Sequence, residues 1–531
     1  MSARAQPTPH FSPELDLEAA FPAASRADWL ALVERGLKGQ GFDATLVMRT
    51  LDGIAVAPLF ADGDAPAAAD CEAALSGDRP RRGWLIGQTY AHPDPAEARR
   101  QILADLARGV EGIGLRLDRA TRLGLRPGDP GWVEQAGVDG ILLGGEDALE
   151  ALLEGVQLEM VQLSFQAGEA AEGVWLALQR IAARRGLDAS QLRVALDDDP
   201  LGRLAEAGRA RRADDGGLVA PTPALRDLPA ARRSALRSVG VSTLAYHAAG
   251  ASPVQELAFA MATAAAYLRQ MAAQGWEAAM ACEQIRFGFA VDADFFGSVA
   301  KLRAARRLWC RLQRALDGNT EQAGPMLLAA SSSPRSLAAV DPWVNPIRAT
   351  QQAVAAIVGG ADQLSLLPYD AALGPSDEPA LRLAVNTQSI LMLEAGLDRL
   401  ADPAGGSHYL EWLTDRLARE AWRRFREIEQ AGGMLAALRE GRVQAAVAEM
   451  AAARRAAVAE GRQTVVGVSK YPPPADQPPA GHPAPDLGPL RAAALARQAA
   501  RAETVGPAGP DRAWLEVEPL RPMRDGEPEH G

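Results

Sequence analysis

Residues 285–367 contain IRFGFAV (285–291), FFGSVAKLRAARRLWCRLQRALDG (295–318), MLLAA (326–330), PIRATQQAVAAIVGG (346–360) and QLSLL (363–367). Short β-rich runs alternate here with long helical patterns. Short apolar runs rich in β-branched and aromatic residues are typical of buried strands, whereas apolar residues three and four apart are typical of helices. The alternation therefore predicts strand–helix–strand units, whose strands pair in parallel.

The same alternation extends back to the first third of the chain. Eight strands are expected, at Gly112–Leu117, Gly140–Leu143, Leu158–Phe165, Leu192–Leu196, Val241–His247, Ile285–Val291, Met326–Ala330 and Gln363–Leu367. Eight parallel repeats favour closure into a (β/α)8 barrel of the α/β class. The alternative is an open, doubly wound sheet of the same elements. No GxGxxG motif follows the first strand, so a dinucleotide-binding sheet has little support.

Composition changes along the chain and predicts four segments. Residues 1–40 form a Pro-rich arm with a helix expected at Ser25–Gly39, and we expect this arm to bind a partner. Residues 41–408 form the barrel, and residues 409–465 are amphipathic helices. Residues 466–531 form a Pro/Ala-rich linker, a short helix at Pro489–Glu503 and a frayed tail. The tail is too short for another nucleotide- or corrin-binding domain.

Charge and cysteine content restrict the class of protein. The chain has 56 Lys and Arg against 67 Asp and Glu, a net charge of −11, with no basic stripe that would bind nucleic acid. The 3 cysteines have no metal-ligand spacing. No signal peptide and no apolar run of membrane-spanning length is found. We expect a cytoplasmic protein that binds neither nucleic acid nor membrane.

Five stretches resemble the acyl-CoA mutases that use adenosylcobalamin, most closely the methylmalonyl-CoA mutase family. They are Tyr246-His247 with Ala249-Gly250-Ala251, the run Ala300–Trp309, Asp341-Pro-Trp343 with Asn345 and Arg348, Asn386-Thr-Gln388, and Asp402–Thr414. The likeness runs from about Trp84 to Gly433 in the family's order. The mutase domain of that family is a (β/α)8 barrel, in agreement with the count of strands.

The resemblance implies a set of site residues. In the family a histidine donates to the thioester carbonyl, an arginine and a tyrosine frame the acyl group, and CoA threads along the barrel axis between small polar side chains. His247, at the end of the fifth predicted strand, matches the histidine, and Arg286 matches the arginine. The tyrosine falls on Thr89 if no gap is allowed, or on Tyr90 after a one-residue slip. Gln88, Thr89 and Tyr90 are therefore candidate substrate contacts.

Departures from the family pattern predict a degenerate site. Val161, Leu163 and Phe165 stand where the family has Ser, Ser and Thr, and period-2 alternation puts all three on one face. We expect that face to be the lumen, now filled with apolar side chains. The segments Leu327–Arg335 and Leu366–Pro368 also replace polar family motifs, and the family's CoA-gripping motif has no counterpart in Leu75–Trp84. His247 is then expected to be a relic, hydrogen-bonded in a dry core.

Three further charged features are read as structural. Asp197, Asp198 and Asp199 alternate in direction and cannot all converge, so we predict a solvated loop and no metal site. Arg286 is expected to pair with a nearby carboxylate such as Glu283 or Asp292. The Arg-rich helix Lys301–Arg314 is expected to present an exposed or interface face.

These features together predict the small subunit of a heterodimeric methylmalonyl-CoA mutase, which interconverts (R)-methylmalonyl-CoA and succinyl-CoA. The large subunit is expected to carry adenosylcobalamin and the working site, and acyl-CoA reaches this chain only through the complex. One alternative is a catalytic barrel subunit whose cobalamin domain is a separate chain. A second is a stand-alone scaffold protein.

Overall fold

The computed structural model describes residues 24–61, 63–64, 83–211, 236–317, 324–474, 481, 483, 485–502 and 514–526. The chain divides into two compact units, Met1–Phe60 and Ala61–Gly531.

The first unit contains two helices and a small hairpin. Helix α2 (Arg26–Leu37) confirms the predicted helix, and Ser25 and Asp28 close its first turn as a capping box. Helix α3 (Phe42–Leu46) follows, and strands β1 (Met48–Arg49) and β2 (Ala55–Val56) pair antiparallel. None of the residues of α2 is buried, and Leu32 is 60% exposed. The apolar residues nearer the start of the arm, from Phe11 to Phe21, lie outside the described residues.

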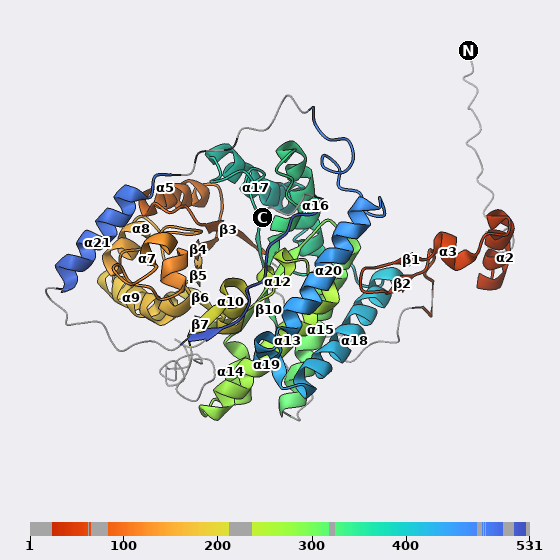
Figure 1. Cartoon of the computed structure of the whole chain (residues 1–531), viewed down its shortest axis with the longest axis horizontal. Coiled ribbons are helices and arrows are strands. Elements are labelled where there is room, and N and C mark those ends of the chain that lie inside the picture. The colour runs from red at the N-terminus through yellow and green to blue at the C-terminus, as the bar shows by residue number, and fades with distance from the viewer. Residues whose placement is uncertain are drawn as a thin grey trace, which may run out of the picture. The chain divides into compact units, whose positions relative to one another are not determined.

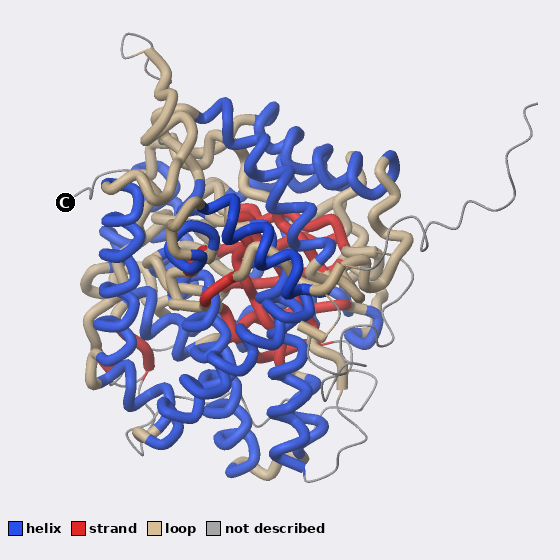
Figure 2. The backbone as a smooth tube through the Cα atoms, turned by 90° about the vertical axis from the view of Figure 1, so that its right-hand side faces the viewer, coloured by secondary structure: helices blue, strands red, loops and turns tan. Residues whose placement is uncertain are grey.

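The second unit is built on a closed parallel barrel, which confirms the predicted (β/α)8 fold. Within the described residues its strands run in the order β3 (Leu85–Tyr90), β4 (Gly112–Arg116), β5 (Gln162–Gln166), β6 (Arg193–Asp198), β8 (Leu236–Ser242), β9 (Ile285–Val291), β10 (Leu327–Ser332) and β11 (Gln363–Ser365). Strand β11 pairs with β3 and closes the ring. Figure 2 shows the strands inside a surrounding layer of helices.

Two of the predicted strands are wrong in detail. Gly140–Leu143 is not a barrel strand, since only Ile141 pairs, in an isolated bridge with Leu117. The strand missing from the predicted set is β3, which precedes Gly112. The fifth strand lies earlier than predicted, at Leu236–Ser242, and His247 belongs to the short helix α12 (Leu244–Ala248). The chain turns into that helix at Thr243, whose carbonyl accepts from the His247 amide at 2.8 Å.

The outer helices alternate with the strands. They are α5 (Pro95–Leu106), α8 (Glu146–Leu152), α9 (Ala171–Arg184), α10 (Pro200–Ala207), α13 (Pro253–Ala273), α15 (Phe295–Asp317), α16 (Asn345–Val358) and α17 (Glu378–Ser389), with short turns at α6 (Arg119–Arg122), α7 (Trp132–Gln135) and α14 (Ala278–Glu283). Helices α5, α10 and α13 each begin with an Asp or Ser cap and a proline in the first turn. Proline is favourable there because its missing N–H would have no helical partner.

The chain after the barrel folds back onto it. Helix α18 (His408–Gln430) packs against α13 and α15, and α19 (Gly433–Arg439) and α20 (Arg442–Ala459) follow (Figure 1). Helix α21 (Gly488–Ala502) covers the α7 region, and strand β12 (Trp514–Glu516) pairs antiparallel with β7 (Arg209–Arg211). The expectation of a frayed tail is therefore wrong for residues 514–526.

Helix α15 contradicts the prediction of an exposed Arg-rich face. Lys301, Arg303, Arg306 and Arg307 are all buried. Arg303 and Arg307 face α18, whereas Lys301 faces α13 and Arg306 donates to the carbonyls of Met326 and Gly360. Carboxylates compensate the buried charges: Arg303 pairs with Asp402, Arg303 and Arg307 share Glu411, Arg306 pairs with Asp362, and Lys301 pairs with Glu256. Charges at helical spacing do not distinguish a solvated face from a face of buried ion pairs.

Candidate functional site

The two faces of the barrel strands are fixed by contacts with the outer helices. Ile86 of β3 packs with Val385 of α17, and the Phe287 ring of β9 lies 4.9 Å from the Trp309 ring of α15. Both residues therefore point outward. Aligned residues of neighbouring parallel strands point the same way, so the register carries this assignment around the barrel.

The register overturns the expectation of an apolar lumen. Leu163 and Phe165 align with Ile113 and Leu115, which align with Gln88 and Tyr90 on the outward face of β3. Leu163 and Phe165 do share one face, but it is the helix-packed face, and Val161 lies just before β5. Parallel barrel strands are buried on both sides, so apolar content does not tell which face is the lumen. If the residues are aligned one position out of step with the strand, those assigned to the lumen and those assigned to the outer face change places.

The lumen face is lined instead by small and polar residues. They are Gly87, Thr89, Gly112, Gly114, Arg116, Gln162, Ser164, Gln166, Arg286, Gly288, Ala290, Ala329, Ser331, Gln363 and Ser365, with Leu85 and Leu327 as apolar members. Many of these residues are partly exposed, whereas the outward residues of the same strands are buried. The residues facing the barrel axis are therefore accessible to solvent.

The three candidate contacts on β3 divide between the two faces. Thr89 faces the lumen, where its Oγ1 lies against Gly114. Tyr90 faces outward, is buried, and its hydroxyl donates to Asp105 Oδ2 of α5 at 3.1 Å. Gln88 also faces outward and is buried. Of the two candidates for the tyrosine position, Thr89 and Tyr90, only Thr89 therefore faces the lumen.

Arg286 spans the lumen. Its Nη1 donates to Asp197 Oδ2 of β6 at 2.6 Å, and its Nη2 donates to Gln363 Oε1 of β11 at 2.8 Å. Its partner is therefore Asp197, not Glu283 or Asp292 as expected. Strands β6 and β11 each lie two strands away from β9, so these contacts reach past the intervening strands.

The acidic run at the end of β6, Asp197 to Asp199, is held by protein contacts. Asp198 pairs with Arg203, and buried Asp199 accepts from the Tyr267 hydroxyl at 2.5 Å. The three carboxylates diverge, as predicted, but the prediction of a solvated loop is wrong. Within the described part of the chain, no group of three His, Cys, Asp or Glu residues is placed to hold a metal ion.

His247 is completely buried, and both its ring nitrogens have partners. Nδ1 lies 2.8 Å from Glu256 Oε1, and Nε2 lies 2.7 Å from Ser333 Oγ. An ionised carboxylate only accepts, so Nδ1 carries the proton, Nε2 of the neutral ring accepts, and the Ser333 hydroxyl donates. Burial lowers the pKa of His247, and the charge of Arg335 lowers it further, which keeps the ring neutral.

Glu256 is the centre of this buried cluster. Burial alone would raise the pKa of Glu256, but Lys301 and His247 bring it down to about 2. The carboxylate accepts from His247, from Lys301 Nζ at 2.9 Å and from Thr243 Oγ1 at 2.9 Å. Three donors thus hold one buried carboxylate in its ionised form.

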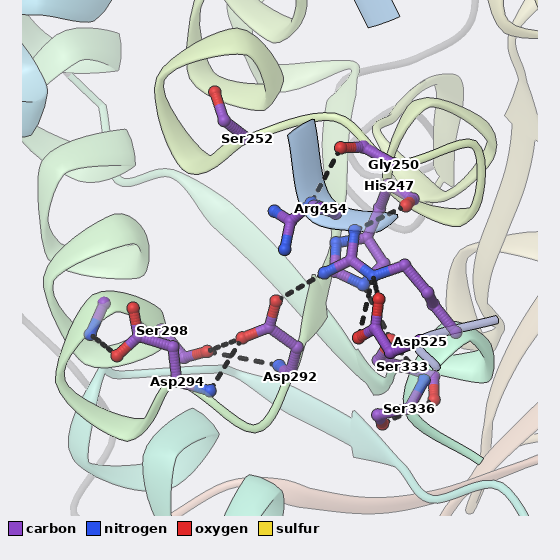
Figure 3. Close-up of polar contacts among 12 residues, drawn as sticks. His247, Gly250, Ser252, Asp292, Asp294, Ser298, Ser333, Ser336, Arg454 and Asp525 are labelled. Carbon is purple, nitrogen blue, oxygen red and sulfur yellow. Dashed lines mark hydrogen bonds and ion pairs between the residues drawn. The ribbon is translucent and has the colours of Figure 1, made fainter. Parts of the chain in front are cut away.

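A second buried cation lies beside the histidine. Arg335, which follows β10, donates from Nη1 to the His247 carbonyl at 3.0 Å and from Nη2 to Asp292 Oδ2 at 2.7 Å. Its Nε lies 3.1 Å from Asp525 Oδ1 of the C-terminal segment. Figure 3 shows His247, Ser333, Asp292 and Asp525 gathered at this point.

Residues 74–503 match the model of the methylmalonyl-CoA mutase family. The chain belongs to this family. It is 37% identical over 490 residues to the methylmalonyl-CoA mutase small subunit of Streptomyces virginiae, an alignment that covers 90% of this chain and 75% of the relative. It is 31% identical over 476 residues to the small subunit of Propionibacterium freudenreichii subsp. shermanii, covering 86% and 70%.

A relative named simply methylmalonyl-CoA mutase is also similar. The protein of Cereibacter sphaeroides is 31% identical over 465 residues, and the alignment covers 83% of this chain but 64% of the relative. The family consists of cobalamin-dependent isomerases. Among the described residues no helix has the length and apolar character needed to cross a bilayer.

Sequence reasoning located His247 but not its partners. Glu256 and Ser333 lie 9 and 86 positions away in the chain, and Asp292 and Asp525 lie on other elements again. The one local signal was the capping box of Ser252 and Gln255, which starts α13 just before Glu256. The long-range contacts require the fold.

Proposed function

We propose that this chain is the small subunit of a heterodimeric, adenosylcobalamin-dependent methylmalonyl-CoA mutase and that its role in the complex is structural. The complex interconverts (R)-methylmalonyl-CoA and succinyl-CoA. Two relatives that cover most of this chain carry the name small subunit, which supports a large partner subunit.

The hydrogen bonds of His247 are the observation that supports a structural rather than a catalytic role. A thioester carbonyl needs a donor, but Nε2 of His247 accepts a hydrogen bond from the Ser333 hydroxyl and the Nδ1 proton is donated to Glu256. Protonation would create a donor at Nε2, yet burial and Arg335 lower the pKa and oppose it. The side chain is also closed off from solvent. As placed, His247 has no free proton to offer a substrate.

Two other positions support a degenerate site. Thr89 replaces the tyrosine expected on the lumen face and is too short to frame an acyl group in the same way. The guanidinium of Arg286 already donates hydrogen bonds to Asp197 and Gln363. The proposal rests on these three positions and not on an apolar lumen.

The cofactor is expected on the large subunit. In barrel enzymes the reaction takes place at the C-terminal ends of the strands. Here residues 517–525 make backbone hydrogen bonds to segments that follow β6, β8 and β10. Residues 517–525 thus lie across part of the face at which a cofactor would bind, and no step through the cofactor is derived for this chain.

A second candidate is a catalytic barrel subunit whose cobalamin domain is a separate chain. The small, polar and partly exposed lumen favours it, since an acyl-CoA threaded along the axis needs such a lining. The third, a stand-alone scaffold, predicts purification without any mutase subunit. Co-expression with a candidate large subunit distinguishes the three.

The chain purified alone is expected to retain no corrin and to convert no methylmalonyl-CoA. The reason is that both ring nitrogens of His247 are already hydrogen-bonded within the protein and that residues 517–525 cover part of the C-terminal face. Corrin absorbance per mole of protein and succinyl-CoA formation in the presence of added adenosylcobalamin are the measurements. The complex purified after co-expression with the large subunit should contain bound corrin and should form succinyl-CoA. Turnover by the lone chain supplied with cofactor would favour the second candidate.

A further inference from the structure

The C-terminal strap, residues 514–526, crosses the end of the barrel where the strands finish. Its first part pairs with β7, and the Val517 and Leu520 amides then donate to the carbonyls of Gly208 and Ala205 at the end of α10. The Met523 and Asp525 amides donate to the carbonyls of Ala248 after β8 and Arg335 after β10, at 2.8 and 2.9 Å. The strap is thus attached to three successive regions of the C-terminal face.

The attachment ends in an ion pair in the buried cluster. The side chain of Arg335 is 0% exposed and lies between Asp292 of the barrel and Asp525 of the strap.

The strap adds a carboxylate to that cluster. With His247 neutral, the carboxylates Glu256, Asp292, Asp294 and Asp525 face the cations Lys301, Arg335 and Arg454. Arg454 of α20 donates to the carbonyl of Gly250 and completes the group. Removal of Asp525 takes away one of the two carboxylates that pair with Arg335 and leaves its buried guanidinium with Asp292 alone. The loss of a partner from a buried charge favours hydration and opening of the region.

The strap also forms one wall of a cavity of about 1100 Å³. The opposite walls come from Ala248 and Ala249 after β8, from Pro334 after β10 and from α20, including Ala448 and Ala451. Pro334 directly follows Ser333, and Ala248 directly follows His247. The cavity therefore lies next to the His247–Ser333 pair, with the strap on one side.

The strap itself is weakly packed. Only Leu515 and Leu520 among its described residues are buried, and Glu518, Pro519, Arg521 and Pro522 are exposed. Segments with little apolar burial open locally, at a lower free energy than the core to which they are attached. The ion pair between Asp525 and Arg335 therefore contributes a large share of the interactions that hold the strap in place.

We propose that the C-terminal strap is a detachable closure of the barrel, latched by Asp525 on Arg335, and that its release opens the His247 cluster to solvent and to ligands. Such a closure goes beyond the proposed role as a subunit. It means that the chain's own C-terminal strap decides whether solvent and ligands reach the C-terminal face of the barrel.

Hydrogen exchange and histidine modification of the full-length chain test the closure. In the wild type, the amides of residues 517–525 should exchange faster than those of β8 and β9. Asp525→Asn should speed strap exchange by about tenfold or more and raise the rate of diethyl pyrocarbonate modification of His247 to a similar degree, with strand amides unchanged. Glu518→Gln, whose exposed side chain pairs only loosely with Arg521, is the matched control and should change neither.

Truncation after residue 513 gives a second test. The truncated chain should keep its strand protection, and His247 should be modified at least as fast as in Asp525→Asn. The closure is refuted if the wild-type strap exchanges only together with the barrel strands, or if Asp525→Asn leaves both readouts at the wild-type level. It is also refuted if truncation unfolds the barrel, since the strap would then be part of the core.

Discussion

Replacing Glu256 by alanine is expected to lower the free energy of unfolding by about 3–5 kcal/mol, the usual cost of removing one partner from a buried ion pair. Glu256 is 1% exposed and is the shared acceptor of His247, Lys301 and Thr243. Without it, buried Lys301 loses its carboxylate partner and the Nδ1 proton of His247 loses its acceptor. Denaturant unfolding followed by circular dichroism measures the loss.

The control for this variant is an exposed ion pair in the same chain. Glu427 pairs with Arg423 on α18, and both side chains are more than half exposed. Glu427→Ala should therefore cost less than about 1 kcal/mol. A loss of the same small size for Glu256→Ala would mean that the cluster is not a stabilising centre of the barrel.

Deletion of residues 1–39 is expected to abolish co-purification with the large subunit and to leave the barrel folded. Helix α2 has no buried residue, and Leu32 on it is 60% exposed. Exposed apolar residues on an arm are typical of a surface that a partner covers. Stable interfaces between subunits often bury on the order of 2,000 Å² or more, so an arm of this length can supply a substantial part of one.

A point variant makes this test sharper. Leu32→Asp should weaken binding of the large subunit in a pull-down, whereas Glu34→Gln on the same helix should not. Circular dichroism of both variants and of the deletion checks that the barrel is intact. If the deleted chain pairs with unchanged affinity, the arm is not the clamp and the outer helices of the barrel carry the interface.

The barrel was predictable from the sequence because its strand–helix alternation is regular, although one strand was placed wrongly. Gly140–Leu143 was counted and Leu85–Tyr90 was not, so the number of strands came out right through two compensating errors. Periodicity detects apolar runs. It does not tell which runs pair around the barrel.

The site was less predictable because its features depend on direction and on distant contacts. The alternation of Leu163 and Phe165 was correct, but the face that they share was assigned wrongly. Likewise, the charges of α15 gave no sign that they would be buried. Asp525, more than two hundred positions from His247, entered the cluster only through the fold of the strap.

The turnover of the reconstituted complex with His247→Ala tests the central claim, that this chain holds no working site. The complex should be purified at equal stoichiometry and assayed well below the temperature at which the variant unfolds. Because His247 offers no proton to substrate, kcat is expected to stay within about twofold of the wild-type value, while the subunit loses stability. Loss of one donor to a developing charge at a carbonyl costs about 10²–10³ in kcat. A hundredfold fall in kcat with the complex intact would contradict the account and make His247 a working residue.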